Sequence, residues 1–271
     1  MVGARDLEAA CIAWQRLGFT VSPRGRHIGW GTANYCIMLE QGYIELLGIV
    51  DPSQFTNNLD RFLERREGLL GLAFASDDGA ETYRRLTAAG LHPDGPKDLK
   101  RILELPEGEA LPAFKLVFLP PAETPGLSAF ICHHLTPEVV RRPAWLAHAN
   151  GATRLAEVTV VVDRPGETVL GYAPMFGPEA LWITDGAAEI ETGQGRVRFV
   201  TPEGLARFYP DARPAAEPPT PWMAAMTIEV ADIGHAAECL RQRGVPAAQS
   251  ANRLVVLPEV ATGALLEFRP C

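Results

Sequence analysis

The sequence repeats one pattern four times along its 271 residues. Each copy passes from an apolar, strand-like stretch through an acidic turn into an amphipathic segment, then through a glycine into further strand-like stretches. The acidic residue can cap the N-terminus of a helix, and the glycine can end that helix in a left-handed turn. Because repeated units must stack or pair to bury their apolar faces, the repeat limits the fold more than any single motif does.

Each copy indicates a β-α-β-β-β unit. The acidic turns lie at Asp6, Asp78, Asp163 and Asp232, and the closing strands lie at 42–49, 126–132, 195–200 and 263–268. The predicted units span residues 1–50, 68–133, 155–201 and 222–270. The first unit begins inside its first strand, so we expect that strand to be truncated; a natural start upstream of Met1 would complete it.

A single β-α-β-β-β unit exposes one face of its sheet, so burial of apolar surface favours pairing of two units. The pattern therefore predicts an α+β fold of two cup-shaped half-barrel domains, at 1–134 and 155–271, joined by an irregular connector at 135–154. Two segments are expected to be surface loops, the polar stretch 97–112 and the Pro/Ala-rich stretch 210–221.

Composition narrows the class of partner. The net charge of −8 and the absence of Lys/Arg clusters argue against nucleic acid or an anionic membrane and favour a small-molecule ligand. The five cysteines are scattered without a C-x-x-C pair, which indicates neither a disulfide framework nor a zinc knuckle. Without a membrane-length apolar stretch or a signal-like N-terminus, we expect a cytoplasmic protein. A homodimer stays open.

Four segments carry a family resemblance. They are GRHIGWGTAN at 25–34, GYIELL at 42–47, CHHLTPE at 132–138 and WLAHANG at 145–151. Together with the repeat, they resemble the glyoxalase-like domain family of the vicinal oxygen chelate superfamily, which includes glyoxalase I, extradiol dioxygenases and antibiotic-resistance proteins. The resemblance implies the paired-cup fold over nearly the whole chain. It implies little about the reaction, because one fold hosts many chemistries.

In metal-using members of that superfamily, ligands on the first and last strands of a unit point into the cup. The matching positions here are Gly71, Glu157 and Ala225 on first strands, and Glu45, Phe130, Arg198 and Glu267 on last strands. A divalent metal needs three or four His, Asp or Glu ligands, and Arg198 is expected to pair with a carboxylate instead. We therefore predict no cofactor; a metal stays open only if the natural N-terminus is longer or a loop histidine substitutes.

The first cup is the predicted site. Strand alternation puts Glu45 on the face opposite Ile44 and Leu46, where a partly desolvated carboxylate suits a general base. Glycine-flanked His27 is the second predicted catalytic residue, as a polariser of a bound carbonyl. The predicted substrate-binding residues are Asn34, Trp30, Tyr43 and His133. Three of these residues have a structural alternative. Glu45 could form an outer salt bridge, His27 could be solvated at the rim, and Asn34 could close an Asx turn.

Two functions remain open from sequence. The first is an enzyme of lyase or isomerase type that moves a proton on a small carbonyl-bearing substrate, with Glu45 as base and His27 as polariser. The second is a non-catalytic binding or resistance protein, which needs an apolar cup with a few polar anchors. A solvent-exposed Glu45 would favour the binding protein.

Overall fold

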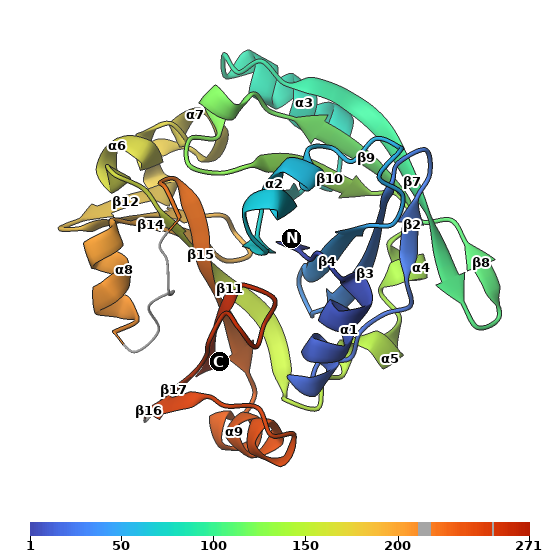
Figure 1. Cartoon of the computed structure of the whole chain (residues 1–271). Helices are drawn as coiled ribbons and strands as arrows, with labels where there is room; N and C mark the ends of the chain where they lie inside the picture. The colour runs from blue at the N-terminus through green and yellow to red at the C-terminus, as the bar shows by residue number, and fades with distance from the viewer. Residues whose placement is uncertain (211–217, 251) are drawn as a thin grey trace.

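All four predicted units are present in the computed structural model, which describes residues 1–210, 218–250 and 252–271 (Figure 1). The first unit consists of β1 (Val2–Gly3), α1 (Leu7–Arg16), β2 (Gly25–His27), β3 (Thr32–Met38) and β4 (Tyr43–Ile49). The second consists of β6 (Leu72–Ala75), α3 (Gly79–Ala88), β7 (Asp94–Leu105), β8 (Gly108–Ala110), β9 (Ala113–Phe118) and β10 (Ala129–His134).

The third unit consists of β11 (Ala152–Val161), α6 (Pro165–Leu170), α7 (Ala173–Phe176), β12 (Leu181–Thr184), β13 (Ala187–Glu191) and β14 (Arg196–Val200). The fourth consists of β15 (Trp222–Val230), α9 (Ile233–Gln242), β16 (Ala248–Ser250), β17 (Arg253–Val256) and β18 (Leu265–Pro270). In every unit the first strand runs parallel to the last, which confirms the predicted β-α-β-β-β topology. As expected, β1 is short, with two residues.

The remaining elements connect these units. They are α2 (Leu59–Arg65), β5 (Gly68–Leu69), α4 (Pro137–Val140), α5 (Pro143–Leu146), α8 (Pro202–Phe208) and two 3-10 turns at Pro121–Glu123 and Pro178–Ala180. Segment 135–154 is therefore partly helical where an irregular connector was predicted. Asn150 ties it to the first half, because its buried amide donates to the Leu17 carbonyl at 3.0 Å. Most of the predicted loop 210–221 falls at 211–217, outside the described residues.

Helix capping follows the predicted acidic turns in three units. The carboxylates of Asp6, Asp78 and Asp232 each accept hydrogen bonds from backbone amides in the first turn of α1, α3 and α9. The third unit differs, because α6 begins after Arg164 with Pro165 as its first residue, without a side-chain cap. Proline suits that position, since the amide it lacks has no partner within the helix.

The two sheets join their units along different edges. The first sheet has the order β5-β1-β4-β3-β2-β7-β9-β10-β6, so its units meet where β2 pairs with β7. The second has the order β12-β13-β14-β11-β15-β18-β17-β16, so its units meet at the first strands. Figure 1 shows the first sheet in blue and green and the second in yellow to red.

The prediction of a surface loop at 97–112 is wrong for its first part. Residues up to Leu105 belong to β7, a strand of 12 residues that pairs with both β2 and β9. Leu99, Arg101, Leu103 and Leu105 alternate, so they share one face of the strand, on which Arg101 and Leu103 are buried. The charged residues Lys100, Arg101 and Glu104 made this strand resemble a polar loop in the sequence.

One apolar core holds both halves together. It includes Trp14 and Phe19 from the first unit and Phe268 from the last. The rings of Phe19 and Phe268 stack with centroids 6.0 Å apart, and the Trp14 indole donates to the Thr262 hydroxyl at 3.2 Å. The convex faces thus pack together, which leaves the concave faces as places for a ligand. Among the described residues, none of the helices is long and apolar enough to cross a bilayer.

Candidate functional site

A cavity of about 480 Å³ lies in the cup of the first sheet. Its walls are largely apolar and aromatic, with side chains of Trp30, Leu99, Phe114, Leu116, Phe118 and Phe130. Its polar groups include those of His27, Thr32, Asn34, Tyr43, Glu45 and Arg101. A concave apolar chamber with a few convergent polar groups is the usual form of a small-molecule site.

Strand alternation explains why these groups meet. Asn34 on β3 and Glu45 on β4 lie on neighbouring antiparallel strands, with Asn34 opposite Leu47 and Glu45 opposite Cys36. Every second residue faces the cup, so Asn34, Cys36, Glu45 and Leu47 share one face while Ile44 and Leu46 enter the core behind the sheet. The predicted orientation of Glu45 is therefore present, and its side chain is 12% exposed.

Asn34 is the centre of the polar cluster. Its Nδ2 donates to Glu45 Oε1 at 2.5 Å and lies 3.4 Å from His27 Nε2. The residue is 2% exposed, and its amide bridges the catalytic candidates instead of closing an Asx turn. This bond leaves the second carboxylate oxygen of Glu45 without any contact to Asn34.

His27 completes the cluster from β2. Its Nε2 lies 3.9 Å from Glu45 Oε1, and its Nδ1 lies 2.9 Å from the Thr32 hydroxyl. Burial lowers the pKa of His27 below its usual value, although the neighbouring Glu45 carboxylate opposes the shift. The ring is therefore neutral at pH 7, and its contact with Glu45 is not an ion pair. It can donate or accept one hydrogen bond, depending on its tautomer.

The sequence reasoning missed Arg101, which lines the cavity from β7 and is 5% exposed. Its Nη1 donates to Asn34 Oδ1 at 2.8 Å and to Cys36 Sγ at 3.2 Å. The Asn34 amide thus links the Arg101 guanidinium to the Glu45 carboxylate. Alternation of Arg101 with Leu99 and Leu103 was the signal that could have revealed it.

Three of the four predicted binding residues, Asn34, Trp30 and Tyr43, line the cavity, and His133 does not. Trp30 and Tyr43 contribute wall, as their positions beside His27 and Glu45 require. His133 instead faces α3, where its Nδ1 accepts a hydrogen bond from the Gly79 amide at 3.2 Å. The physical reason is that adjacent residues of a strand point to opposite faces, and Cys132 takes the cup face of β10.

His134 shares the face of Cys132. Its ring meets those of Phe114 and Tyr43 edge-on, with centroids 4.8 and 5.5 Å apart. Burial lowers the pKa of His134 to about 4, so this ring is also neutral at pH 7. Burial raises the pKa of the Cys132 thiol to about 12, which makes that cysteine a packed residue and a poor nucleophile.

The polar residues of this cavity do not fit a divalent metal. Glu45 is the one carboxylate among its described lining residues, and the Arg101 guanidinium occupies the same wall. Nowhere in the described ranges do three or more His, Cys, Asp or Glu side chains gather in a way that could hold a metal ion. A buried cation beside a single carboxylate disfavours a second cation there.

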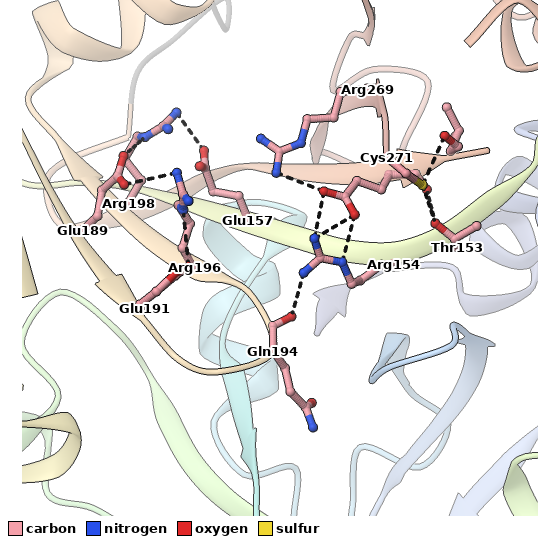
Figure 2. A network of polar contacts seen from close by, with 12 residues as sticks. Thr153, Arg154, Glu157, Glu189, Glu191, Gln194, Arg196, Arg198, Arg269 and Cys271 are labelled. Carbon is pink, nitrogen blue, oxygen red and sulfur yellow. Dashed lines mark hydrogen bonds and ion pairs between the residues drawn. The ribbon is translucent and has the colours of Figure 1, made fainter. Parts of the chain in front are cut away.

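The second cup is organised differently, as Figure 2 shows: Glu157, Glu189 and Arg198 point toward one another. Arg198 Nη1 lies 2.8 Å from Glu157 Oε1, and its Nε lies 2.8 Å from Glu189 Oε1. The predicted pairing of Arg198 with a carboxylate is confirmed. Burial raises the pKa of Glu157, which is 2% exposed, although Arg198 opposes the shift.

Part of the second cup is filled by its own chain. Leu205 and Tyr209, at the end of α8, pack against Val161 and Ala225 on the concave face. The ring of Phe208 lies under the Arg198 guanidinium, 4.7 Å from its centre. Arg198 is therefore paired with carboxylates and covered by its own chain.

A further cavity, of about 580 Å³, lies between the two halves. It shares Tyr43, Glu45 and Cys132 with the cavity of the first cup. Glu45 therefore borders both spaces.

This paired-cup architecture, with a polar cluster on the floor of one cup, defines a protein of the vicinal oxygen chelate type. The chain belongs to the glyoxalase-like domain family, which it matches over residues 1–176. Among proteins with curated descriptions, none matches this sequence.

Solved structures agree on the fold. A hypothetical protein from Staphylococcus aureus is similar with a TM-score of 0.72 at 12% identity, over 100% of this chain and 98% of that one. A variant of 4-hydroxymandelate synthase from Streptomyces coelicolor is similar with a TM-score of 0.58 at 14% identity, over 98% and 90%. A xylose isomerase-like TIM barrel/4-hydroxyphenylpyruvate dioxygenase fusion protein has the same TM-score of 0.58 and 14% identity, over 100% and 48%. At these identities the likeness concerns the fold alone.

Proposed function

We propose that the first cup binds a small carbonyl compound and transfers a proton on it, in a reaction of lyase or isomerase type. The observation that carries this proposal is the convergence of Glu45, Asn34 and His27 within one apolar-walled cavity. A carboxylate held in a water-poor chamber beside a neutral imidazole is a common arrangement for removing a proton next to a carbonyl.

The roles follow from the contacts. Glu45 takes the proton from the carbon next to the carbonyl, and the electron pair of that C–H bond moves toward the carbonyl oxygen. His27 donates a hydrogen bond to that oxygen in the tautomer with its proton on Nε2; the Thr32 hydroxyl then donates to Nδ1, and Asn34 Nδ2 bonds to Glu45 alone. Asn34 orients Glu45 through its bond to Oε1. Return of the proton to another carbon gives isomerisation, and loss of a neighbouring leaving group gives elimination.

A binding protein is the second candidate, and the extent of apolar wall favours it. Phe114, Leu116 and Phe118 supply a surface that can hold a ligand without any chemistry. In that case the polar cluster acts only as an anchor. The low exposure of Glu45 favours the enzyme, because an anchor needs no shielding from water.

The test is exchange of carbon-bound hydrogen with solvent in D₂O, followed by proton NMR. A panel of small ketones and aldehydes is used, with levulinate and methyl levulinate among them. We expect the wild-type protein to accelerate exchange beyond buffer for at least one compound, and Glu45→Gln to abolish it while retaining binding of the same compound. Binding without exchange across the whole panel would establish the second candidate.

A further inference from the structure

We infer that the ligand of the first cup is an anion, a carbonyl compound bearing a carboxylate that is held by Arg101. This inference deepens the proposed function and rests on it for the carbonyl part of the ligand. Its own basis is the Arg101 guanidinium, which is buried and has no role in the proposed reaction.

Arg101 is a buried cation with incomplete partners. It is 5% exposed, and its hydrogen bonds within the described part of the chain go to two neutral acceptors, Asn34 Oδ1 and Cys36 Sγ. Its buried Nε has no hydrogen-bond acceptor among the described residues. A buried charge is costly unless it is paired, so this side chain favours a negatively charged group from outside the chain.

Arg198 in the second cup is the arginine to compare with Arg101. Arg198 is 18% exposed at its side chain and yet meets two carboxylates, from Glu157 and Glu189, each at 2.8 Å. Arg101 is more deeply buried, and Asn34 stands between it and Glu45. The Asn34 amide therefore holds the opposite charges apart where direct contact would neutralise both.

The chemistry of the cavity selects a carboxylate. A guanidinium presents a planar fork of donors that matches the two oxygens of a carboxylate. The Phe114 ring lies 5.6 Å from the guanidinium centre and offers apolar wall beside that point. Because Arg101 and Glu45 both bond to Asn34, a ligand that reaches both needs only a few carbon atoms between its carboxylate and its reacting carbon.

The experiment compares benzoate with benzamide, which have nearly the same shape but differ in charge. Dissociation constants are measured by calorimetry for the wild-type protein, Arg101→Met, Arg101→Lys and Glu45→Gln. We expect wild type to bind benzoate at least about tenfold more tightly than benzamide, as one charge-assisted hydrogen bond to a buried group implies. Arg101→Met should lose this preference, and Arg101→Lys should keep part of it. Glu45→Gln should bind benzoate at least as tightly as wild type, because it removes a nearby negative charge.

Several results would overturn the inference: equal or tighter binding of benzamide by wild type, a benzoate preference that survives in Arg101→Met, or no benzoate binding at millimolar concentration. If Arg101→Met does not fold, the ¹⁵Nε–H resonance of Arg101 in wild type decides, because benzoate must shift it and benzamide must not. The exchange assay separates the two proposals. If wild type prefers benzoate but exchanges hydrogen on no compound, the anion site is supported and the proposed reaction is contradicted. If wild type exchanges levulinate and methyl levulinate equally, the reaction is supported and the anion site is contradicted.

Discussion

The units of both cups have the same topology, and each cup contains an arginine and at least one glutamate, yet the two cups arrange these charges in opposite ways. In the second cup, Arg198 bonds directly to Glu157 and Glu189, and Phe208 covers it. In the first, Arg101 and Glu45 are separated by the Asn34 amide at the edge of a cavity of about 480 Å³. Charged side chains that pair directly with one another stabilise the cup that contains them. Charged side chains that are held apart can still bind a ligand.

The way the units join explains part of this difference. In the second sheet the first strands lie at the centre, which places Glu157 beside Arg196 and Thr227 on neighbouring strands. In the first sheet β2 lies between β3 and β7, so Arg101 approaches Asn34 across β2. Gly25 makes this approach feasible, because a Cβ there would lie 2.3 Å from Asn34 Oδ1 and 3.0 Å from Arg101 Cδ.

The largest expected effect tests whether only the first cup is catalytic. Glu45 and Glu267 occupy the same position on the last strands of their units. Glu45→Gln should lower the exchange rate by about 10²–10⁴-fold, because an amide hydrogen-bonds but cannot accept the proton. Glu267→Gln should leave the rate within about threefold, since Glu267 belongs to the other sheet and does not line the cavity of the first cup. Equal losses in both variants would show that the cups do not differ in the proposed way.

The next largest effect is on stability, measured as the free energy of unfolding in urea for variants of the two arginines. Arg198→Met leaves the buried Glu157 without its cation, although Glu189 keeps Arg196 at 3.3 Å, so it should lower the free energy of unfolding by about 3–5 kcal/mol. Arg101→Met removes hydrogen bonds to neutral groups only and should cost about 1–2 kcal/mol. A larger loss in Arg101→Met would mean that its charge stabilises the fold more than it serves a ligand.

The pH dependence of the free energy of unfolding should come largely from a histidine in the first half of the chain, His134. The unfolded chain takes up a proton on His134 near pH 6.5, whereas the folded chain does so only near pH 4, so the unfolded state binds more protons between these values. The free energy of unfolding should therefore fall as the pH drops from 6.5 to 4, by at most about 3 kcal/mol from this residue.

His134→Phe preserves the aromatic contacts and should flatten that dependence, measured as urea midpoints at pH 7.5 and pH 5. The control is His92→Gln, because the His92 side chain is 85% exposed and should contribute little. An unchanged slope in His134→Phe would assign the acid sensitivity to other groups, such as His27 and His148, whose pKa values burial also lowers.

The last comparison concerns Gly25, where a substitution acts on the cluster only indirectly. In Gly25→Ala the new methyl group meets Asn34 Oδ1, so Asn34 must shift and its bonds to Arg101 and Glu45 must lengthen. Such overpacking should cost about 1–3 kcal/mol of stability and reduce both exchange and benzoate preference. Gly48→Ala is the matched control, because it crowds Leu7 on the helix side of β4 and should lower stability without touching the cluster.

Short-range periodicity in the sequence determined the secondary structure of much of this protein and the face of β4 on which Glu45 lies. The alternation of Ile44, Glu45 and Leu46 predicts which face of β4 the carboxylate takes, and the acidic turns at Asp6, Asp78 and Asp232 predict where helices begin. These signals involve residues a few positions apart, whose geometry is set by local backbone sterics and hydrogen bonds. The four units and the position of Glu45 follow from them, as does the expectation that His27 and Asn34 lie near it.

Only the tertiary structure decided how the units join and which charges meet. Nothing local indicates that β2 pairs with β7, and that pairing is what carries Arg101 to Asn34 across 67 residues of sequence. The same holds for the filling of the second cup by Tyr209 and for the turn of His133 toward Gly79. These outcomes depend on the register and burial of strands far apart in the chain, because the free energy of pairing is shared among many contacts that no short segment contains.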